Sequence, residues 1–277
     1  MTASPAPVTP TAADPSPRHR RRWVAVLLTV AVFAVPAGVV ALRGFGGEPA
    51  LRSAVVSAFV GADLSAPVAG SSDLAALVAT WREFHLVKAL LAGLLVLVLV
   101  GLVSSVRRRA EASEPGRRRR VLRAVYAGAV VWLLGALTLL LANLQGTAAP
   151  FASVASFLPP GGTDAVGGVL GDLGGALEAG PPSSVGGVAG ALLRDFTWYH
   201  AVFAVLAAVT GTTLCVQAVR AGWRRWRLRG SGSTGQPTWL LRAGLFGGAG
   251  AVFLLLALAN VSTWLRPVPA LVASLGG

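Results

Sequence analysis

The sequence of 277 residues has little charge and few reactive side chains. Charged residues make up 13% of the chain, hydrophobic residues make up 54%, and the mean hydropathy is +0.68. A soluble globular domain typically carries about 25% charged residues to cover its surface. The composition therefore excludes an ordinary soluble domain and favours a membrane protein.

The chain has one cysteine, Cys215, so an intramolecular disulfide is excluded, and we expect this residue to be a small apolar filler within a span. A zinc site needs three or four ligands, and no suitable spacing is present. No phosphate-binding loop, nucleophile elbow or zinc-protease helix occurs either. We expect no catalytic residue, no metal and no cofactor, which favours a protein that is not an enzyme without excluding one.

Five apolar stretches of about 20 residues match the thickness of a bilayer core, and backbone groups in lipid must be satisfied within their own helix. The expected fold is an all-α membrane protein with five transmembrane helices. The stretches are Trp23–Leu42, Leu86–Val106, Ala124–Leu144, Ala201–Val219 and Ala243–Trp264.

Basic residues lie mainly on one side of this five-span topology. That side holds 18 of the 24 Lys and Arg residues: they cluster at Arg18–Arg22, at Arg107–Arg109 with Arg117–Arg120, and at Arg220–Arg229, and Arg123 and Arg242 lie at span entrances. The other side holds six, with eight of the 11 acidic residues. The positive-inside rule then places the N-terminus in the cytoplasm and the C-terminus outside the cell membrane. No basic stripe is interleaved with aromatic residues, so no nucleic acid is expected, whereas anionic lipid headgroups are expected partners of the Arg clusters.

The N-terminal segment 1–22 is expected to be a disordered, basic cytoplasmic tail, followed by one membrane domain at 23–277. Arg20-Arg21-Arg22-Trp23 before an apolar run is similar to a twin-arginine export signal, but the run is long for a cleaved signal, so an uncleaved span is favoured. These four residues, with the preference for Arg over Lys and the abundance of Ala, Gly and Val, resemble integral membrane proteins of high-GC actinobacteria. The resemblance implies no functional residue.

The two outer loops contain candidate short helices. The first loop offers Pro49–Val60 and Asp73–Trp81, and the second offers Pro150–Leu158, Thr163–Ala179 and Ser183–Arg194. In Thr163–Ala179 the apolar residues recur at helical spacing, which predicts an apolar face lying on membrane or protein.

An internal repeat is the most informative pattern. Residues 135–150 align with 252–267, which matches Asn143 with Asn260 and Pro150 with Pro267. Arg82-Glu83-Phe84 likewise matches Arg194-Asp195-Phe196. We therefore predict two tandem two-helix repeats, at about 73–158 and 183–275, added to the N-terminal span. Asn143 and Asn260 are expected to cap their helices or to bond between helices.

Polar residues gather at the outer ends of the second and fourth predicted spans, and they form the candidate ligand-binding or headgroup-binding set: Arg82, Glu83, His85, Lys88, Arg194, Asp195 and His200. In the repeat alignment Lys88 falls opposite His200. One interpretation is an interfacial belt of aromatic and snorkelling cationic residues. A second is a cationic site for an anionic ligand or lipid headgroup. A third uses His85 and His200 as axial haem ligands.

No carboxylate lies in the middle of a predicted span, which argues against a proton- or sodium-coupled pump. The expected function is a non-enzymatic structural, partner-binding or lipid-binding membrane component with an extracytoplasmic working face. The alternative is a small transporter or a membrane-embedded oxidoreductase that uses the outer polar cluster.

Overall fold

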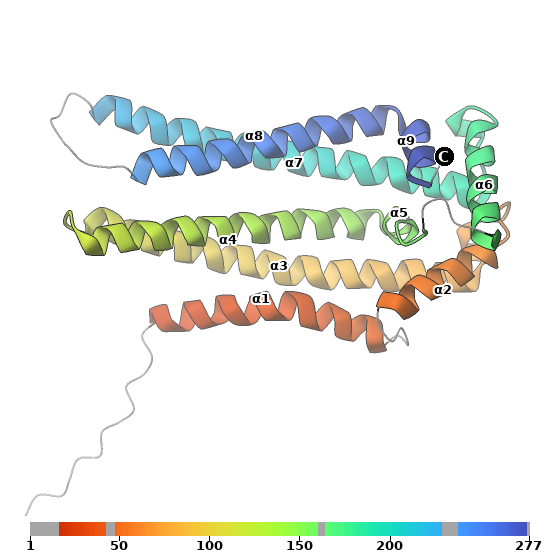
Figure 1. The fold of residues 1–277 in the computed structure, drawn as a ribbon, viewed down its shortest axis with the longest axis horizontal. Coiled ribbons are helices and arrows are strands. Elements are labelled where there is room, and N and C mark those ends of the chain that lie inside the picture. Colours follow the sequence, from red (N-terminus) through yellow and green to blue (C-terminus); the bar gives the residue numbers. More distant parts are fainter. Residues whose placement is uncertain (1–16, 43–47, 160–163, 229–237, 276–277) are drawn as a thin grey trace, which may run out of the picture.

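The computed structural model describes residues 17–42, 48–159, 164–228 and 238–275, and no strand occurs in these ranges. The elements are α1 (Pro17–Leu42), α2 (Glu48–Val60), η1 (Val68–Gly70), α3 (Ser72–Ala112), α4 (Arg117–Ala148), α5 (Pro150–Ala155), α6 (Asp164–Glu178), η2 (Pro182–Ser184), α7 (Gly187–Leu228), α8 (Thr238–Leu265) and α9 (Pro267–Leu275). The long helices run side by side, and the short helices gather at one end (Figure 1).

Four of the described helices are long and apolar enough to cross a membrane: α3, α4, the Gly187–Arg224 part of α7, and the Trp239–Leu265 part of α8. Large apolar side chains lie exposed along their outer sides, as at Leu90, Leu97 and Val131. Such a surface is unfavourable in water but matches the hydrocarbon of a bilayer. The chain is therefore an all-α protein whose four apolar helices suggest a membrane protein.

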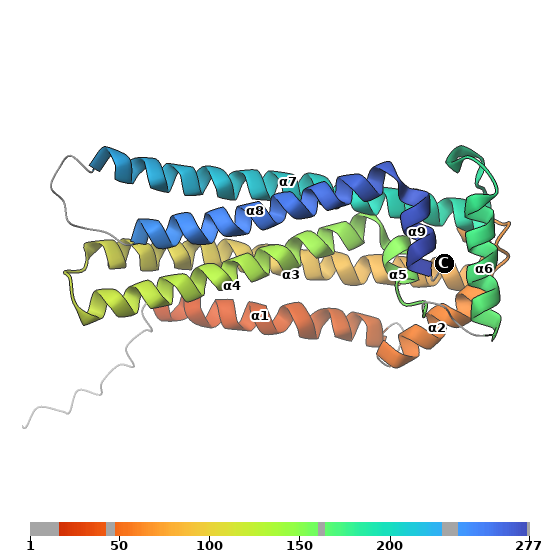
Figure 2. The ribbon, with the colours of Figure 1, turned by 45° about the horizontal axis from the view of Figure 1, so that its top comes forward.

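Helix α1 packs beside α3, on the side of α3 and α4 opposite to α7 and α8 (Figures 1 and 2). Ala25 and Val32 of α1 are fully buried, whereas Trp23 and Phe33 face outward with about 60% of their surface exposed. The apolar stretch of α1 at Trp23–Gly38 is shorter than those of the four longer apolar helices. The helix begins at Pro17, so residues 17–22 of the predicted disordered tail are helical, while residues 1–16 lie outside the described part.

Helices α3 and α7 have 41 and 42 residues, so each is about 60 Å long at 1.5 Å per residue and extends well beyond a bilayer core of about 30 Å. The first turns of α3 and α7 include residues that the sequence predicted as separate short helices. Asp73–Trp81 is not a separate outer helix but the first turns of α3. The expected helix at Ser183–Arg194 is instead η2 followed by the first turns of α7. The predicted short helices at Pro49, Pro150 and Thr163 are present as α2, α5 and α6.

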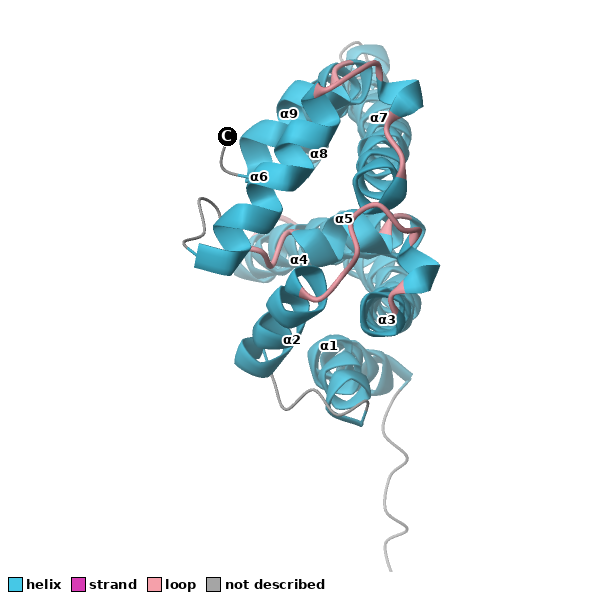
Figure 3. Cartoon of the chain, turned by 90° about the vertical axis from the view of Figure 1, so that its right-hand side faces the viewer, coloured by secondary structure: helices cyan, strands magenta, loops and turns pink. Residues whose placement is uncertain are grey.

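The ends of α3 and α7 support a cap with its own apolar core. Helices α2, α5, α6 and α9 lie across these ends, as the end-on view in Figure 3 shows. The fully buried side chains include Phe59 of α2, Leu74 of α3, Leu173 of α6 and Leu192 of α7. We call this the capped end. The opposite end, where α3, α4, α7 and α8 begin or end among arginines, is the basic end.

Small residues set the distance between α7 and α8. A Cβ built on Gly250 would lie 2.6 Å from Sγ of Cys215 and 3.0 Å from the carbonyl oxygen of Gly211. In lipid, close packing of this kind replaces the hydrophobic effect as the force that associates helices. The predicted role of Cys215 as a small filler fits this contact.

Candidate functional site

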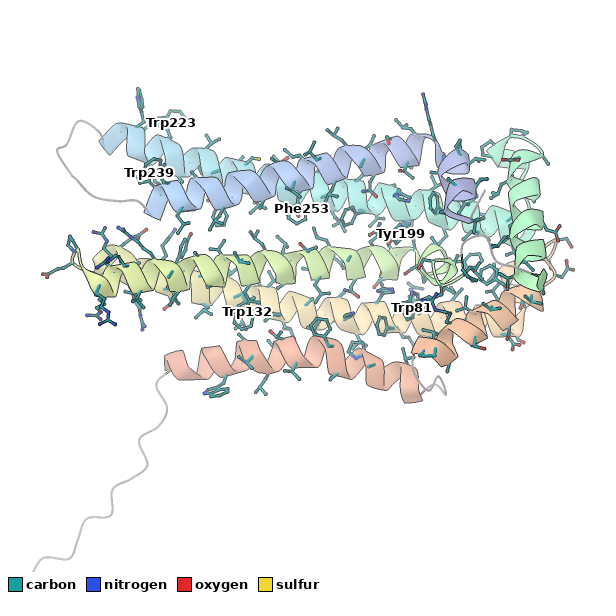
Figure 4. All side chains as sticks on the ribbon, in the orientation of Figure 1. Trp81, Trp132, Tyr199, Trp223, Trp239 and Phe253 are labelled. Carbon is teal, nitrogen blue, oxygen red and sulfur yellow. The ribbon has the colours of Figure 1, made fainter. Side chains whose placement is uncertain are left out.

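The candidate residues lie at the capped end of the bundle, where Trp81 is labelled in Figure 4. His85 of α3 bonds to two other helices. Its Nδ1 atom lies 2.9 Å from Oδ1 of Asn143 on α4, and its Nε2 atom lies 3.1 Å from Oγ of Ser153 on α5. The Ser153 hydroxyl oxygen also accepts the indole N–H of Trp81 at 2.9 Å. Three helices are thus joined through one imidazole.

Close packing holds this imidazole in place. The rings of Trp81 and His85 meet edge to face at 5.0 Å, and Phe84 stacks on Trp81 at 4.6 Å. Gly146 of α4 faces the ring from the other side, because a Cβ built there would lie 2.6–2.7 Å from imidazole atoms. A side chain at this position would displace His85 from its hydrogen bonds.

A second His–Asn pair joins α7 to α8. Nδ1 of His200 lies 2.7 Å from Oδ1 of Asn260, and the ring of Phe196 packs against His200 at 4.5 Å. The two pairs share their spacing: an aromatic residue lies four positions before each histidine, and a proline lies seven positions after each asparagine. Each proline begins a short helix, α5 or α9.

These contacts point to a different register for the predicted repeat. The alignment of Arg82-Glu83-Phe84 with Arg194-Asp195-Phe196 places Lys88 opposite His200, but the hydrogen bonds give His85 and His200 the same role. The predicted bond between helices is confirmed for both Asn143 and Asn260. The predicted helix cap is wrong for both, because α4 continues to Ala148 and α8 to Leu265.

Asp195 of α7 bonds to α5, which follows α4. Its Oδ2 atom accepts the backbone N–H of Ala152 at 2.8 Å, near the N-terminus of α5, where free N–H groups favour a carboxylate. Near this contact Gln145 of α4 donates its Nε2–H to the carbonyl oxygen of Tyr199 on α7, at 3.1 Å.

A shallow depression of about 390 Å³ lies beside Asp195, between α5 and α7. Arg194 and Trp198, both exposed, form its polar and aromatic sides. Its other wall is apolar and includes Val68 and Phe151. An arginine and a tryptophan beside an apolar wall resemble the residues that dominate binding surfaces.

The remaining candidates do not join this depression. Nζ of Lys88 lies over the rings of Phe84 and of Phe33 on α1, at 5.1 and 5.5 Å. His200 faces α8, on the far side of α4 from α1 (Figures 1 and 2), so the structure does not bring Lys88 and His200 together. Arg82 is exposed and Glu83 is half-buried on α3. The position of Lys88 fits an interfacial cation held by aromatic rings.

The order Ser153–His85–Asn143 matches the nucleophile, base and orienting group of a covalent hydrolase. Here, however, the Ser153 oxygen already accepts an indole N–H and the imidazole is enclosed by rings, so the polar groups satisfy one another. Among the described residues, no three His, Cys, Asp or Glu side chains come together as a metal site requires. Sequence reasoning missed Ser153. The sequence does contain a relevant pattern: Pro150 lies seven residues after Asn143 and begins α5, the helix that carries Ser153.

No protein-family model matches this chain, and neither a curated protein nor a solved structure matches it significantly.

Proposed function

We propose that the protein is a five-span, non-enzymatic component of the cell membrane that binds a partner or lipid through its capped end. The observation that carries this proposal is the cap itself. Four short helices with a continuous apolar core are held on the ends of α3 and α7, and this is a larger structure than a connection between spans requires. The spans would anchor this surface, and the depression at Arg194 and Trp198 would bind the partner.

The polar groups at the capped end support binding rather than chemistry. His85, His200 and Asp195 each make a hydrogen bond to another helix. Catalytic groups act on a substrate within reach, which requires that their reactive atoms are accessible. A binding component should retain its interaction when both histidines are replaced by phenylalanine, whereas a haem protein or enzyme should lose its activity.

The proposed topology has α1 as a fifth span and places the capped end outside the cell. Support comes from the exposed apolar side of α1, which only lipid would cover, and from the basic loops at the other end. Single cysteines in a Cys215→Ala background test this topology. An impermeant maleimide should label Ser183→Cys in intact cells and should label Glu114→Cys only after permeabilisation. The reverse pattern would invert the topology, and labelling of both in intact cells would exclude it.

We also propose that the membrane domain consists of two tandem two-helix repeats. Each unit would consist of a long inward helix, a basic turn, a long outward helix and a short proline-initiated helix. The matched His–Asn pairs, 58 and 60 residues apart, support this duplication. Such units, oriented alike, would be related by an axis along the membrane normal.

Photo-crosslinking in cells tests the binding surface. A photoreactive residue at position 198 should give a discrete adduct, because Trp198 is exposed at the depression. Arg194→Glu should abolish this adduct, whereas Arg266→Glu, a charge reversal of another exposed arginine at the same end, should leave it. Equal adduct in all three proteins, or none in the parent, would count against the depression as the working surface.

A further inference from the structure

The last part of α7 carries an exposed face on which apolar, aromatic and basic side chains follow one another toward the basic end. Its members are Val209, Val216, Val219, Trp223 and Arg227, and all five side chains are exposed. They are spaced seven, three, four and four positions apart. Residues at this spacing lie on one side of an α-helix, so they form a continuous face.

This face points away from the rest of the bundle. On the other side of α7, Ala221 is buried, and Ala218 faces α8, where a Cβ built on Gly247 would lie 3.6 Å from the Cβ of Ala218. Figure 4 shows Trp223 on the outer side of α7 at the basic end. When α7 crosses a bilayer, acyl chains cover such an apolar face.

Trp223 and Arg227 lie at the depth of lipid headgroups. The apolar run of α7 ends at Val219, and Trp223 lies four residues, or about 6 Å, beyond it. The headgroup layer is about 5–7 Å thick on each side of the hydrocarbon core, and tryptophan is typical of this layer. Side chains of a helix lean toward its N-terminus, which for this end of α7 means back toward the bilayer. The guanidinium of Arg227 accordingly lies over the ring of Trp223, with its Cζ atom 5.4 Å from the ring centroid.

The exposed arginines of this face have no acidic partner within the described part of the chain. Arg220 is exposed one position after Val219, and no carboxylate forms an ion pair with Arg220 or Arg227 in the ranges that the structure describes. No Asp or Glu follows Asp195 in the sequence, so α7 and α8 supply no acid at this end. Glu111 of α3 lies 3.8 Å from the Nε atom of an arginine on its own helix. The face therefore presents two cations to an anion from outside the chain.

We propose that Arg220 and Arg227, with Trp223 between them, bind the headgroup phosphate of an anionic phospholipid whose acyl chain lies along the valines of α7. Guanidinium groups suit the oxygens of a phosphate because their N–H donors have a fixed planar geometry. A soluble phosphate compound would occupy the arginines but leave the valines uncovered, so the continuous face favours a lipid. The site lies at the opposite end from the cap and does not depend on the binding surface proposed there.

The start of α4 offers a matched comparison at the same end. Arg117 and Arg118 are exposed there, and no aromatic residue occurs among the first two turns, residues 117–124. Because α4 runs away from the basic end, its first side chains lean away from the bilayer rather than toward it. We therefore expect these arginines to contribute charge without forming a lipid site.

Native mass spectrometry of the purified full chain tests the site. The protein in mild detergent is titrated with phosphatidylglycerol or with phosphatidylcholine of the same acyl chains. We expect preferential retention of phosphatidylglycerol, weakened about tenfold or more in the variant R220Q/R227Q. The matched control R117Q/R118Q removes the same charge from exposed positions of α4 and should bind like the parent. The variant R220K/R227K keeps the charge and should bind within about threefold of the parent.

A competition arm separates the lipid from a soluble ligand. Glycerol phosphate, which has the phosphate group but no acyl chain, should not displace phosphatidylglycerol at constant ionic strength. Displacement would identify a soluble phosphate compound and overturn the proposal. Equal weakening in R220Q/R227Q and R117Q/R118Q would overturn it as well, because diffuse surface charge would then explain the binding, and so would equal retention of the two lipids. If R220Q/R227Q does not fold, as judged by its Tm, Arg227→Gln compared with Arg117→Gln gives the same test.

Discussion

His85 Nδ1 donates its proton to Oδ1 of Asn143 across 2.9 Å, and this bond joins α3 to α4 below the cap. The direction follows from the amide of Asn143, whose Nδ2 donates to the carbonyl oxygen of Leu139 and so leaves Oδ1 towards the imidazole. Nε2 of a neutral histidine with this tautomer can only accept, and the Ser153 hydroxyl donates to it. One polar chain therefore fixes the positions of α3, α4 and α5.

The His85–Asn143 bond should show as a coupling in a double-mutant cycle of His85→Phe and Asn143→Leu. Hydrogen bonds between membrane helices contribute on average about 0.6 and at most about 1.7 kcal/mol. We expect a coupling energy in this range, measured as the free energy of unfolding by steric trapping in bicelles. The cycle of His200→Phe and Asn260→Leu should give a similar value. Additivity within about 0.3 kcal/mol would show that the bond does not stabilise the fold.

Ser153→Ala should destabilise the protein by about 1–3 kcal/mol, because it leaves the indole N–H of Trp81 and Nε2 of His85 without their partner. The fluorescence of the chain should also change through Trp81. Ser156→Ala is the matched control, since Ser156 is exposed on the following turn and its hydroxyl donates to the Ser153 carbonyl oxygen. A loss of stability as large in the control would assign the effect to the end of α5 rather than to the histidine contact.

Gly146→Ala should displace His85, because the new Cβ would lie within 2.7 Å of three imidazole atoms. Overpacking of this kind costs about 1–3 kcal/mol. Gly135→Ala, on the same helix, places its Cβ in open space and should be neutral. Thermal unfolding in detergent measures both. If His85→Ala in the Gly146→Ala protein does not recover stability, the clash lies elsewhere.

Gly187→Ala should loosen the start of α7. Gly187 has φ +57°, which side-chain-bearing residues rarely adopt, and its Cβ would clash with the carbonyl oxygen of Leu64. That carbonyl accepts the N–H of Val188, so the bond between the first loop and α7 should break. We expect faster hydrogen exchange of the Val188 amide. Gly186→Ala meets no atom and should leave exchange unchanged.

The sequence predicts the helices well and their contacts less well. Apolar runs set the long helices because lipid permits few alternatives, and Pro150 marks the start of α5. The alignment of Arg82-Glu83-Phe84 with Arg194-Asp195-Phe196 and the pairing of His85 with His200 imply different registers for the predicted repeat, because Arg82 lies three residues before His85 whereas Arg194 lies six residues before His200. The two registers differ by three residues, which is almost one helical turn, so either register places the same types of residue on nearly the same helix face.

The partners of Asp195 and Ser153 could not be predicted, because they depend on how α5 folds back onto α7 and α3. No periodicity encodes that reversal. The exposed Arg194 next to the buried contact of Asp195 illustrates the limit: the sequence shows both charges but not which one is engaged.

Gly250 of α8 lies close to Gly211 and Cys215 of α7. Gly250→Ala should separate α7 from α8, because its Cβ would lie 2.6 Å from Sγ of Cys215 and 3.0 Å from both the Cys215 nitrogen and the Gly211 oxygen. We expect a loss of about 1–3 kcal/mol in the free energy of unfolding. Adding Cys215→Ala should recover only part of this loss, since it removes the sulfur while the two backbone contacts remain. Gly248→Ala is the control, as its Cβ meets no atom within 4 Å. Full recovery by Cys215→Ala would mean that the sulfur alone limits the approach of the helices, and equal loss at positions 248 and 250 would mean that close packing does not set it.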